Sequence, residues 1–219
     1  MAGAGRNNQN QNEPPPLLLA LCRILQNMKK WICLLLFIFG ALLTQAQQRR
    51  NLNFKYFGLT LHPKGDNNAE LMPLNPDGKG YLVLNVGGSV GYEHFLVPGK
   101  FSVKAIQALY ADCALRFAGF THFGLRAVIF DIGRHSMNGG LGPTLVYRRN
   151  WSDLEGYTLS TSFFGGDPDD TWQYKMVWYA GEFEYNYRLS DRTDLSTSFV
   201  PGYPNIMSLS FGVRYWLKD

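Results

Sequence analysis

Residues 81–93 decide the fold and read Tyr-Leu-Val-Leu-Asn-Val-Gly-Gly-Ser-Val-Gly-Tyr-Glu. Side chains of two kinds alternate along this stretch. One parity is apolar and holds Leu82, Leu84, Val86, Val90 and Tyr92, whereas the other is small or polar and holds Asn85, Gly87, Ser89, Gly91 and Glu93. Because successive side chains of a β-strand point to opposite faces, the alternation predicts a strand with one apolar and one polar face.

Similar alternation recurs up to the C-terminus and predicts eight strands. They span residues 54–62, 81–94, 101–110, 117–131, 135–151, 171–189, 194–200 and 206–217. The connections alternate between short turns and longer loops, as in outer-membrane barrels. The polar parity is rich in small residues, which suits a narrow lumen filled by side chains. We therefore expect an all-β fold, an eight-stranded antiparallel up-and-down transmembrane β-barrel, over residues 47–219.

Charged residues in the middle of the predicted strands share the polar parity. They are Glu93, Lys104, Arg126, Arg148, Glu182, Glu184 and Arg214. An unpaired charge inside a barrel costs several kcal/mol, whereas opposite charges across a narrow lumen satisfy one another. We interpret the seven as an interior salt-bridge network. The alternative is that they line a small conducting pore.

The N-terminal part is predicted to direct export. Basic residues at 29–30 precede an apolar run from Trp31 to Leu43, and small residues at Thr44 and Ala46 follow it. This is the pattern of a cleavable signal peptide over residues 28–46, with residues 1–27 a mis-assigned or disordered extension. Cleavage after Ala46 removes residues 1–46 and with them four of 21 basic and one of 17 acidic side chains, which leaves a net charge of +1. Nothing in this charge balance favours binding of nucleic acid.

The last predicted strand carries apolar residues at alternate positions: Leu209, Phe211, Val213, Tyr215 and Leu217. With this strand, residues 54–217 resemble the small eight-stranded outer-membrane barrel proteins of Gram-negative bacteria. The resemblance implies location in the outer membrane and recognition of the C-terminal strand by the barrel insertion machinery. It also implies contact with outer-membrane lipid and lipopolysaccharide. We expect a monomer without a cofactor.

One segment resembles a catalytic motif. Residues 135–140 read His-Ser-Met-Asn-Gly-Gly and are similar to the His-x-Ser-Asn segments of outer-membrane lipid A deacylases. Those enzymes place histidine and serine two residues apart, on one strand face, so that the imidazole can take the hydroxyl proton. Here His135 and Ser136 are adjacent, and Ser136 shares its parity with Asn138. Catalysis would therefore require a β-bulge that brings His135 and Ser136 together.

A second segment is rich in carboxylates. Asp167, Asp169 and Asp170 lie in a Gly- and Pro-containing stretch of the longest loop. Carboxylates there could hold calcium or magnesium and bridge to lipopolysaccharide. The same residue types are also ordinary turn formers, and the spacing matches no EF-hand loop.

These patterns predict architecture and location more sharply than activity. The leading hypothesis is an integral outer-membrane barrel with a structural, adhesion or partner-binding role through its outside loops. A lipid hydrolase that uses His135 and Ser136 is the main alternative. A small pore or a soluble lipocalin-like binder is the second, although a soluble barrel would need the apolar face inside.

Overall fold

The computed structural model describes residues 50–158, 163–165, 167–202 and 206–217. The predicted extension and signal peptide, residues 1–27 and 28–46, lie outside the described residues. The elements, in chain order, are β1 Arg50–Leu61, the 3₁₀ turn η1 Ala69–Leu71, β2 Leu82–Leu84, β3 Val86–Val97, β4 Phe101–Ala111, β5 Phe117–Ile132, β6 His135–Arg149, β7 Trp172–Arg188, β8 Thr193–Gly202 and β9 Ile206–Trp216. Among these described residues, no helix is long and apolar enough to cross a membrane.

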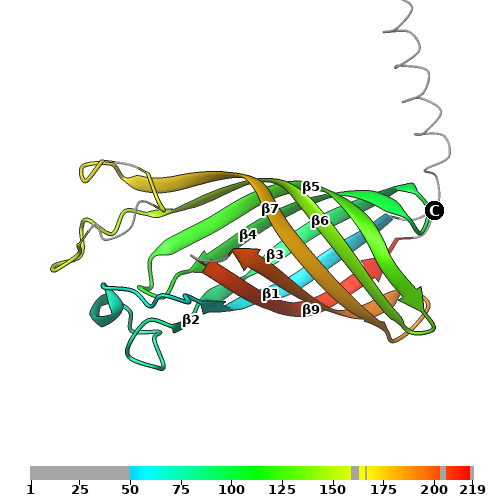
Figure 1. The fold of residues 1–219 in the computed structure, drawn as a ribbon, viewed down its shortest axis with the longest axis horizontal. Helices are drawn as coiled ribbons and strands as arrows, with labels where there is room; N and C mark the ends of the chain where they lie inside the picture. Colours follow the sequence, from blue (N-terminus) through cyan, green and yellow to red (C-terminus); the bar gives the residue numbers. More distant parts are fainter. Residues whose placement is uncertain (1–49, 159–162, 166, 203–205, 218–219) are drawn as a thin grey trace, which may run out of the picture. The chain divides into compact units, whose positions relative to one another are not determined.

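The strands form one closed antiparallel sheet (Figure 1). From β3 to β9 each strand pairs with the next, and β9 returns to pair with β1. Both β2 and β3 pair with β1, so they act as one strand interrupted at Asn85. In the described chain this makes eight barrel staves, which confirms the predicted fold class. Closure matters because it leaves no sheet edge along the β1–β9 seam.

The two ends of the barrel differ in their connections. Residues 62–81, 112–116 and 150–171 form long connections at one end, which we call the loop end. Residues 98–100, 133–134 and 189–192 form short ones at the other, the turn end. Figure 1 shows the loops extending well beyond the strands on the left. This asymmetry is the one that the sequence predicted.

The wall has the polarity of a transmembrane barrel. Outward residues are large and apolar: Leu125 is 64% exposed, Leu141 60% and Phe123 56%. Inward residues are polar, and Glu93 and Glu184 are both 0% exposed. A water-soluble barrel would have the reverse distribution, because apolar side chains lose free energy in water. Residues 81–93 follow the same rule, since Val86 and Val90 are exposed whereas Asn85 and Gly91 are buried.

A β-bulge in β1 breaks the simple alternation. The β1–β9 register shifts between Phe57 and Leu59. The extra residue is Gly58, and a Cβ there would overlap the Tyr56 ring. Phe57 and Thr60, which have opposite parities, are therefore both buried on the lumen side. Bulges change which face a side chain reaches without leaving a mark in the alternation itself.

The wall is least regular between β7 and β8. Only Phe183–Arg188 of β7 pairs with β8, although β7 begins at Trp172. A second irregularity lies between Gly142 and Thr144 of β6, where the β7 partner changes from Ala180 to Val177. In the described chain, residues 175–177 and 180–182 of β7 have partners on β6 alone, and Trp178 and Tyr179 have a partner on neither neighbouring strand. Figure 1 shows β7 diverging from β8 toward the loop end.

Candidate functional site

The inward side chains of the turn-end half form a group that we call the lumen ion cluster. Its described members are Lys55, Glu93, Lys104, Arg126, Glu182, Glu184, Asp194 and Arg214. Four are basic and four are acidic, so the formal charges of this set cancel. The residues come from β1, β3, β4, β5, β7, β8 and β9. The cluster therefore links nearly every stave of the barrel through its interior.

Glu184 is the centre of this cluster. Its carboxylate lies 2.5 Å from Lys55 Nζ and 2.5 Å from Lys104 Nζ. Arg126 Nη2 lies 3.3 Å away and Arg214 Nη1 3.8 Å away. Four cations thus converge on one fully buried carboxylate. Such an arrangement is tolerable in a dry interior only because the other carboxylates share the same cations.

The remaining acidic members complete the network. Glu93 accepts hydrogen bonds from Arg126 Nη1 at 3.1 Å, Asn51 Nδ2 at 2.9 Å and Ser102 Oγ at 2.6 Å. Glu182 lies 3.1 Å from Lys104 Nζ. Arg214 Nη2 lies 2.7 Å from Asp194. These contacts leave the turn-end half of the lumen filled by side chains.

Six of the seven charges predicted for the lumen meet in this cluster, and Arg148 does not. Arg148 lies near the loop end, where Nε donates a hydrogen bond to Gln173 Oε1 at 2.8 Å. Its position near the end of β6 puts it beyond the reach of the carboxylates on mid-strand positions. Lys55 and Asp194 belong to the cluster but were missing from the sequence prediction. The sequence held a signal for both. Lys55 shares the parity of the polar residues Asn51 and Asn53, and Asp194 shares the parity of Ser196 and Ser198.

The cluster makes a testable prediction about conduction. We expect the wild-type protein to show no steady open conductance in a planar bilayer, because paired charges and small polar side chains occupy the turn-end lumen. A variant with both Glu93→Ala and Arg126→Ala removes one basic and one acidic group together and should show measurable openings. Single-channel recording distinguishes a closed lumen from a conducting pore. Steady wild-type conductance would establish the pore alternative instead.

The structure overturns the catalytic arrangement considered for His135 and Ser136. His135 is exposed on the outer face, and its Nδ1 lies 2.6 Å from Tyr185 Oη. Ser136 is buried in the lumen and accepts a hydrogen bond from Arg214 Nη2 at 3.3 Å. Asn138 is also buried. The required bulge is absent at this point of the described sheet, because the β5–β6 register runs regularly from Ile132–His135 to Phe130–Met137. The imidazole therefore cannot take the Ser136 proton.

The carboxylates of the long loop are not gathered into a cluster in the described structure. Asp167, Asp169 and Asp170 are all exposed. The backbone N–H of Asp167 donates to Asp170 Oδ2 at 2.8 Å, which is a turn-forming contact. Within the described part of the chain, no three His, Cys, Asp or Glu side chains lie close enough to hold a metal ion. These aspartates act as turn residues and as surface charge.

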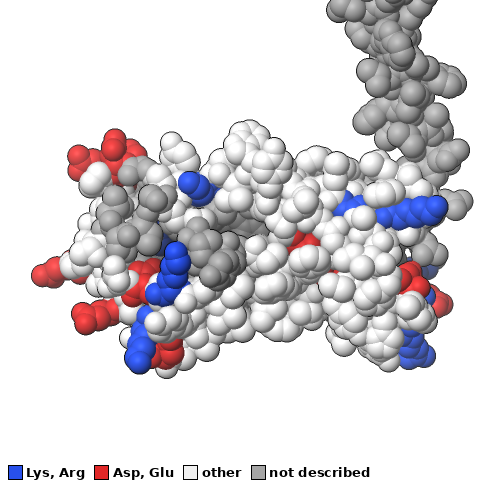
Figure 2. Space-filling view, in the orientation of Figure 1, with Lys and Arg blue, Asp and Glu red and all other residues white. Residues whose placement is uncertain are grey.

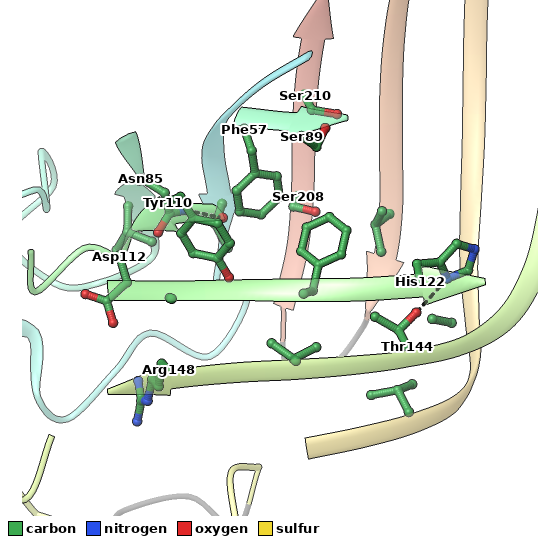
Figure 3. Close-up of a pocket in the computed structure, with 18 of the residues that line it drawn as sticks. Phe57, Asn85, Ser89, Tyr110, Asp112, His122, Thr144, Arg148, Ser208 and Ser210 are labelled. Atoms are coloured by element: carbon green, nitrogen blue, oxygen red, sulfur yellow. Dashed lines mark hydrogen bonds between the residues drawn. The ribbon is translucent and has the colours of Figure 1, made fainter. Parts of the chain in front are cut away.

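The loop-end half of the lumen is not filled. It contains a cavity of about 520 Å³, which we call the loop cavity. Figure 3 places Arg148 and Asp112 at one end of it and His122 with Thr144 at the other, with Phe57 and Tyr110 between them. His122 Nδ1 lies 2.6 Å from Thr144 Oγ1. A side-chain-filled lumen, as predicted from the sequence, is thus present only in the half that holds the lumen ion cluster.

The long connections pack together above the loop cavity and form what we call the loop cap. Its core contains Met72, Val83, Cys113 and Trp151. Trp151 Nε1 donates to Asp112 Oδ2 at 2.8 Å, which ties the β6–β7 connection to the β4–β5 connection. Burial raises the pKa of the Cys113 thiol to about 12, so this thiol stays protonated at neutral pH. The only cysteine among the described residues is therefore a packing residue.

A hydrogen-bonded pair joins two further parts of the loop cap. Asn68 Nδ2 donates to the Thr158 carbonyl at 3.0 Å, and the Thr158 N–H donates to Asn68 Oδ1 at 2.9 Å. The Leu74 N–H donates to the Cys113 carbonyl at 3.2 Å. These contacts connect the β1–β2 loop to both of the other long loops. The loop end is therefore built as one packed unit.

Comparison with solved structures found matches, among them two structures of one outer-membrane protein. One is the crystal structure of Ail, the attachment invasion locus protein of Yersinia pestis, in complex with the heparin analogue sucrose octasulfate. Its identity to this chain is 13%, with a TM-score of 0.41, and the match covers 78% of this chain and 97% of Ail. A second structure of Ail, in a phospholipid bilayer nanodisc, is 11% identical to this chain, with a TM-score of 0.39. That match covers 78% of this chain and 100% of Ail. No protein-family model and no curated protein matches the sequence.

The assignment of this chain rests on its own structure. A closed sheet satisfies the backbone hydrogen bonds that lipid cannot satisfy, and the apolar outer wall matches a hydrocarbon environment. The polar lumen and the contrast of long loops with short turns complete the pattern of bacterial outer-membrane barrels. The chain is an eight-stranded β-barrel with the apolar wall and polar lumen of a transmembrane barrel.

Proposed function

We propose that this barrel is a non-conducting membrane anchor whose loop cap is a preordered, acidic platform for binding a partner at the cell surface. The observation that carries the proposal is the packed core of the loop cap around Trp151, which is 2% exposed. Ordering a surface before binding reduces the entropy lost when a partner docks. A set of loops with only a connecting role would not need such a core.

The charge of the loop end favours a basic partner. Residues 62–81, 112–116 and 150–171 contain nine acidic and three basic side chains, a net charge of −6. Figure 2 shows red acidic groups gathered at this end of the molecule. Complementary potentials speed association and exclude partners of like charge. We therefore propose a cationic protein surface as the partner, since a polysulfated ligand would be repelled.

The proposal includes the route to the membrane. The signal peptide at residues 28–46 would take the chain across the inner membrane, and the loop end would then face outward. β9 supports insertion through the C-terminal strand, because Phe211 and Tyr215 are 49% and 40% exposed on the lipid-facing side. This alternation is the feature expected to be read by the barrel insertion machinery. Contact between the apolar barrel wall and outer-membrane lipid would follow from that orientation.

Neutralising the exposed aspartates of the loop cap should weaken binding. We expect nanodisc-embedded protein to bind an immobilised lysine-rich peptide, and the triple variant Asp167→Asn, Asp169→Asn, Asp170→Asn to bind at least fivefold more weakly, as judged by biolayer interferometry. Salt should weaken binding as well, because exposed charges are screened within about 8 Å at physiological ionic strength.

A matched control comes from the turn end. Asp191→Asn removes one exposed carboxylate from the β7–β8 turn and should leave binding unchanged. The acidic-platform proposal would be contradicted if the wild-type protein bound immobilised heparin as strongly as the lysine-rich peptide, or more strongly. Equal loss of binding in Asp191→Asn and in the triple loop variant would contradict it as well.

A further inference from the structure

The loop cavity has the size and the lining of a ligand site. Its volume of about 520 Å³ lies within the range of about 300–1,000 Å³ that is typical of small-molecule pockets. Its lining includes a set of apolar side chains, which we call the apolar section: Phe57, Ile106, Phe120, Val146 and Val177. The lining also holds Ser89, Ser208 and Ser210. Phe57 and Phe120 pack edge to face, with ring centroids 5.4 Å apart. This apolar section suits a hydrocarbon chain.

Arg148 gives the loop cavity a charge that the described chain does not neutralise by an ion pair. Each basic residue of the lumen ion cluster has a carboxylate within 4.0 Å, but no described carboxylate lies that close to the Arg148 guanidinium. Asp112 borders the same end of the cavity and already accepts bonds from Trp151 Nε1 and from two backbone N–H groups.

The contacts of Arg148 hold its guanidinium in place. Its centre lies 4.0 Å from the Trp151 ring and 4.2 Å from the Phe164 ring. Nε donates to Gln173, and Nη2 lies 3.4 Å from Tyr157 Oη. A fixed guanidinium that lacks a carboxylate partner is well suited to an incoming carboxylate or phosphate.

The lining of the loop cavity extends to the part of the wall where β7 and β8 do not pair. Tyr179 of β7, which is 85% exposed, and Pro201 of β8, which is also exposed, both line it. Tyr179 lies within the stretch of β7 whose described residues have no partner on β8, and Pro201 belongs to the part of β8 that has no partner on β7. Pro201 has no N–H to donate, which disfavours pairing of a strand with this edge.

From these features we infer that the loop cavity binds a single-chain anionic amphiphile of the fatty-acid class. Its acid group pairs with Arg148, and its chain lies along the apolar section toward Tyr179 and Pro201. The ligand enters from the bilayer at this unpaired part of the wall. The site lies inside the barrel and does not depend on the partner proposed for the loop cap.

Photolabelling of the membrane-inserted protein tests this inference. The probe is hexadecanoic acid with a photoreactive diazirine in mid-chain, added to wild-type protein in phospholipid nanodiscs, and labelled residues are mapped by mass spectrometry. We expect label on lumen-facing Phe120 and Val146. Unlabelled hexadecanoic acid should displace it, whereas the cation hexadecyltrimethylammonium should not. Arg148→Gln should reduce the lumen label at least fivefold, and Arg148→Lys should retain most of it.

Two further variants keep the test decisive. Arg149→Gln is the matched control, because the neighbouring Arg149 is exposed and lies over Trp172 outside the lumen; its lumen label should equal that of the wild type. Val146→Trp fills the apolar section and should abolish the lumen label even if Arg148→Gln fails to insert. Label confined to lipid-facing residues such as Leu145, or lumen label that both Arg148→Gln and Val146→Trp leave within twofold of wild type, would overturn the inference.

Discussion

Replacing Glu184 with glutamine is expected to destabilise the barrel by about 3–5 kcal/mol, the usual cost of breaking a buried ion pair by removing one partner. The substitution keeps the shape of the side chain and removes one negative charge from the lumen ion cluster. Four cations that converge on Glu184 would then face three remaining carboxylates. Urea unfolding of the protein in lipid vesicles, followed by the heat-dependent gel shift of folded barrels, measures the change.

An exposed ion pair provides the control for this effect. Arg188 and Asp131 lie 3.7 Å apart with side chains 42% and 45% exposed. Because exposed pairs contribute only about 0–1 kcal/mol, Asp131→Asn should change the free energy of unfolding little. The double variant Glu184→Gln with Lys104→Met restores charge balance and should recover part of the loss. Equal effects of Glu184→Gln and Asp131→Asn would contradict the role assigned to the cluster.

Placing arginine at Leu125 should cost about 2–4 kcal/mol, the depth-dependent penalty for a charge on the lipid face of a barrel near the bilayer midplane. Leu125 lies midway along β5, is 64% exposed and faces Leu141 on β6. The same urea titration in vesicles measures the change. On a water-soluble barrel this substitution would be nearly neutral.

The control is Ile132→Arg, which matches Leu125→Arg in outward exposure but lies at a different depth in the membrane. Ile132 ends β5 and is 71% exposed, so its outward exposure is similar but its depth is not. Near the interface the penalty falls to about 0–1 kcal/mol. A similar cost at both positions, or none at either, would show that the apolar wall does not face a bilayer.

The sequence predicted the strands well because their environment is periodic. Lipid on one side and a polar lumen on the other impose a two-residue repeat that is visible in every stave. Irregularities in strand pairing were missed, because a prediction from alternation assumes that every strand is regular. The bulge at Gly58 and the register change opposite Val177 each insert residues that alternation does not mark, and both alter what reaches the lumen.

The site residues show the limit more clearly. The parity of His135 and Ser136 already placed them on opposite faces, and the regular register at the start of β6, from His135 to Met137, decided that no bulge reunites them. Arg148 shares its parity with the cluster charges but lies at another height in the barrel. Parity gives the face of a side chain, whereas height and strand tilt decide its neighbours.

The sequence alone therefore determined the eight strands, the polar face that would become the lumen and most of the charges that meet there. These follow from local alternation and composition, which each residue carries regardless of its distant neighbours. Only the tertiary structure decided that Glu184 gathers four cations, that Arg148 stands apart and that the loop half of the lumen holds a cavity. Those outcomes depend on closure of β9 onto β1, on bulges and on the relative height of residues far apart in the chain.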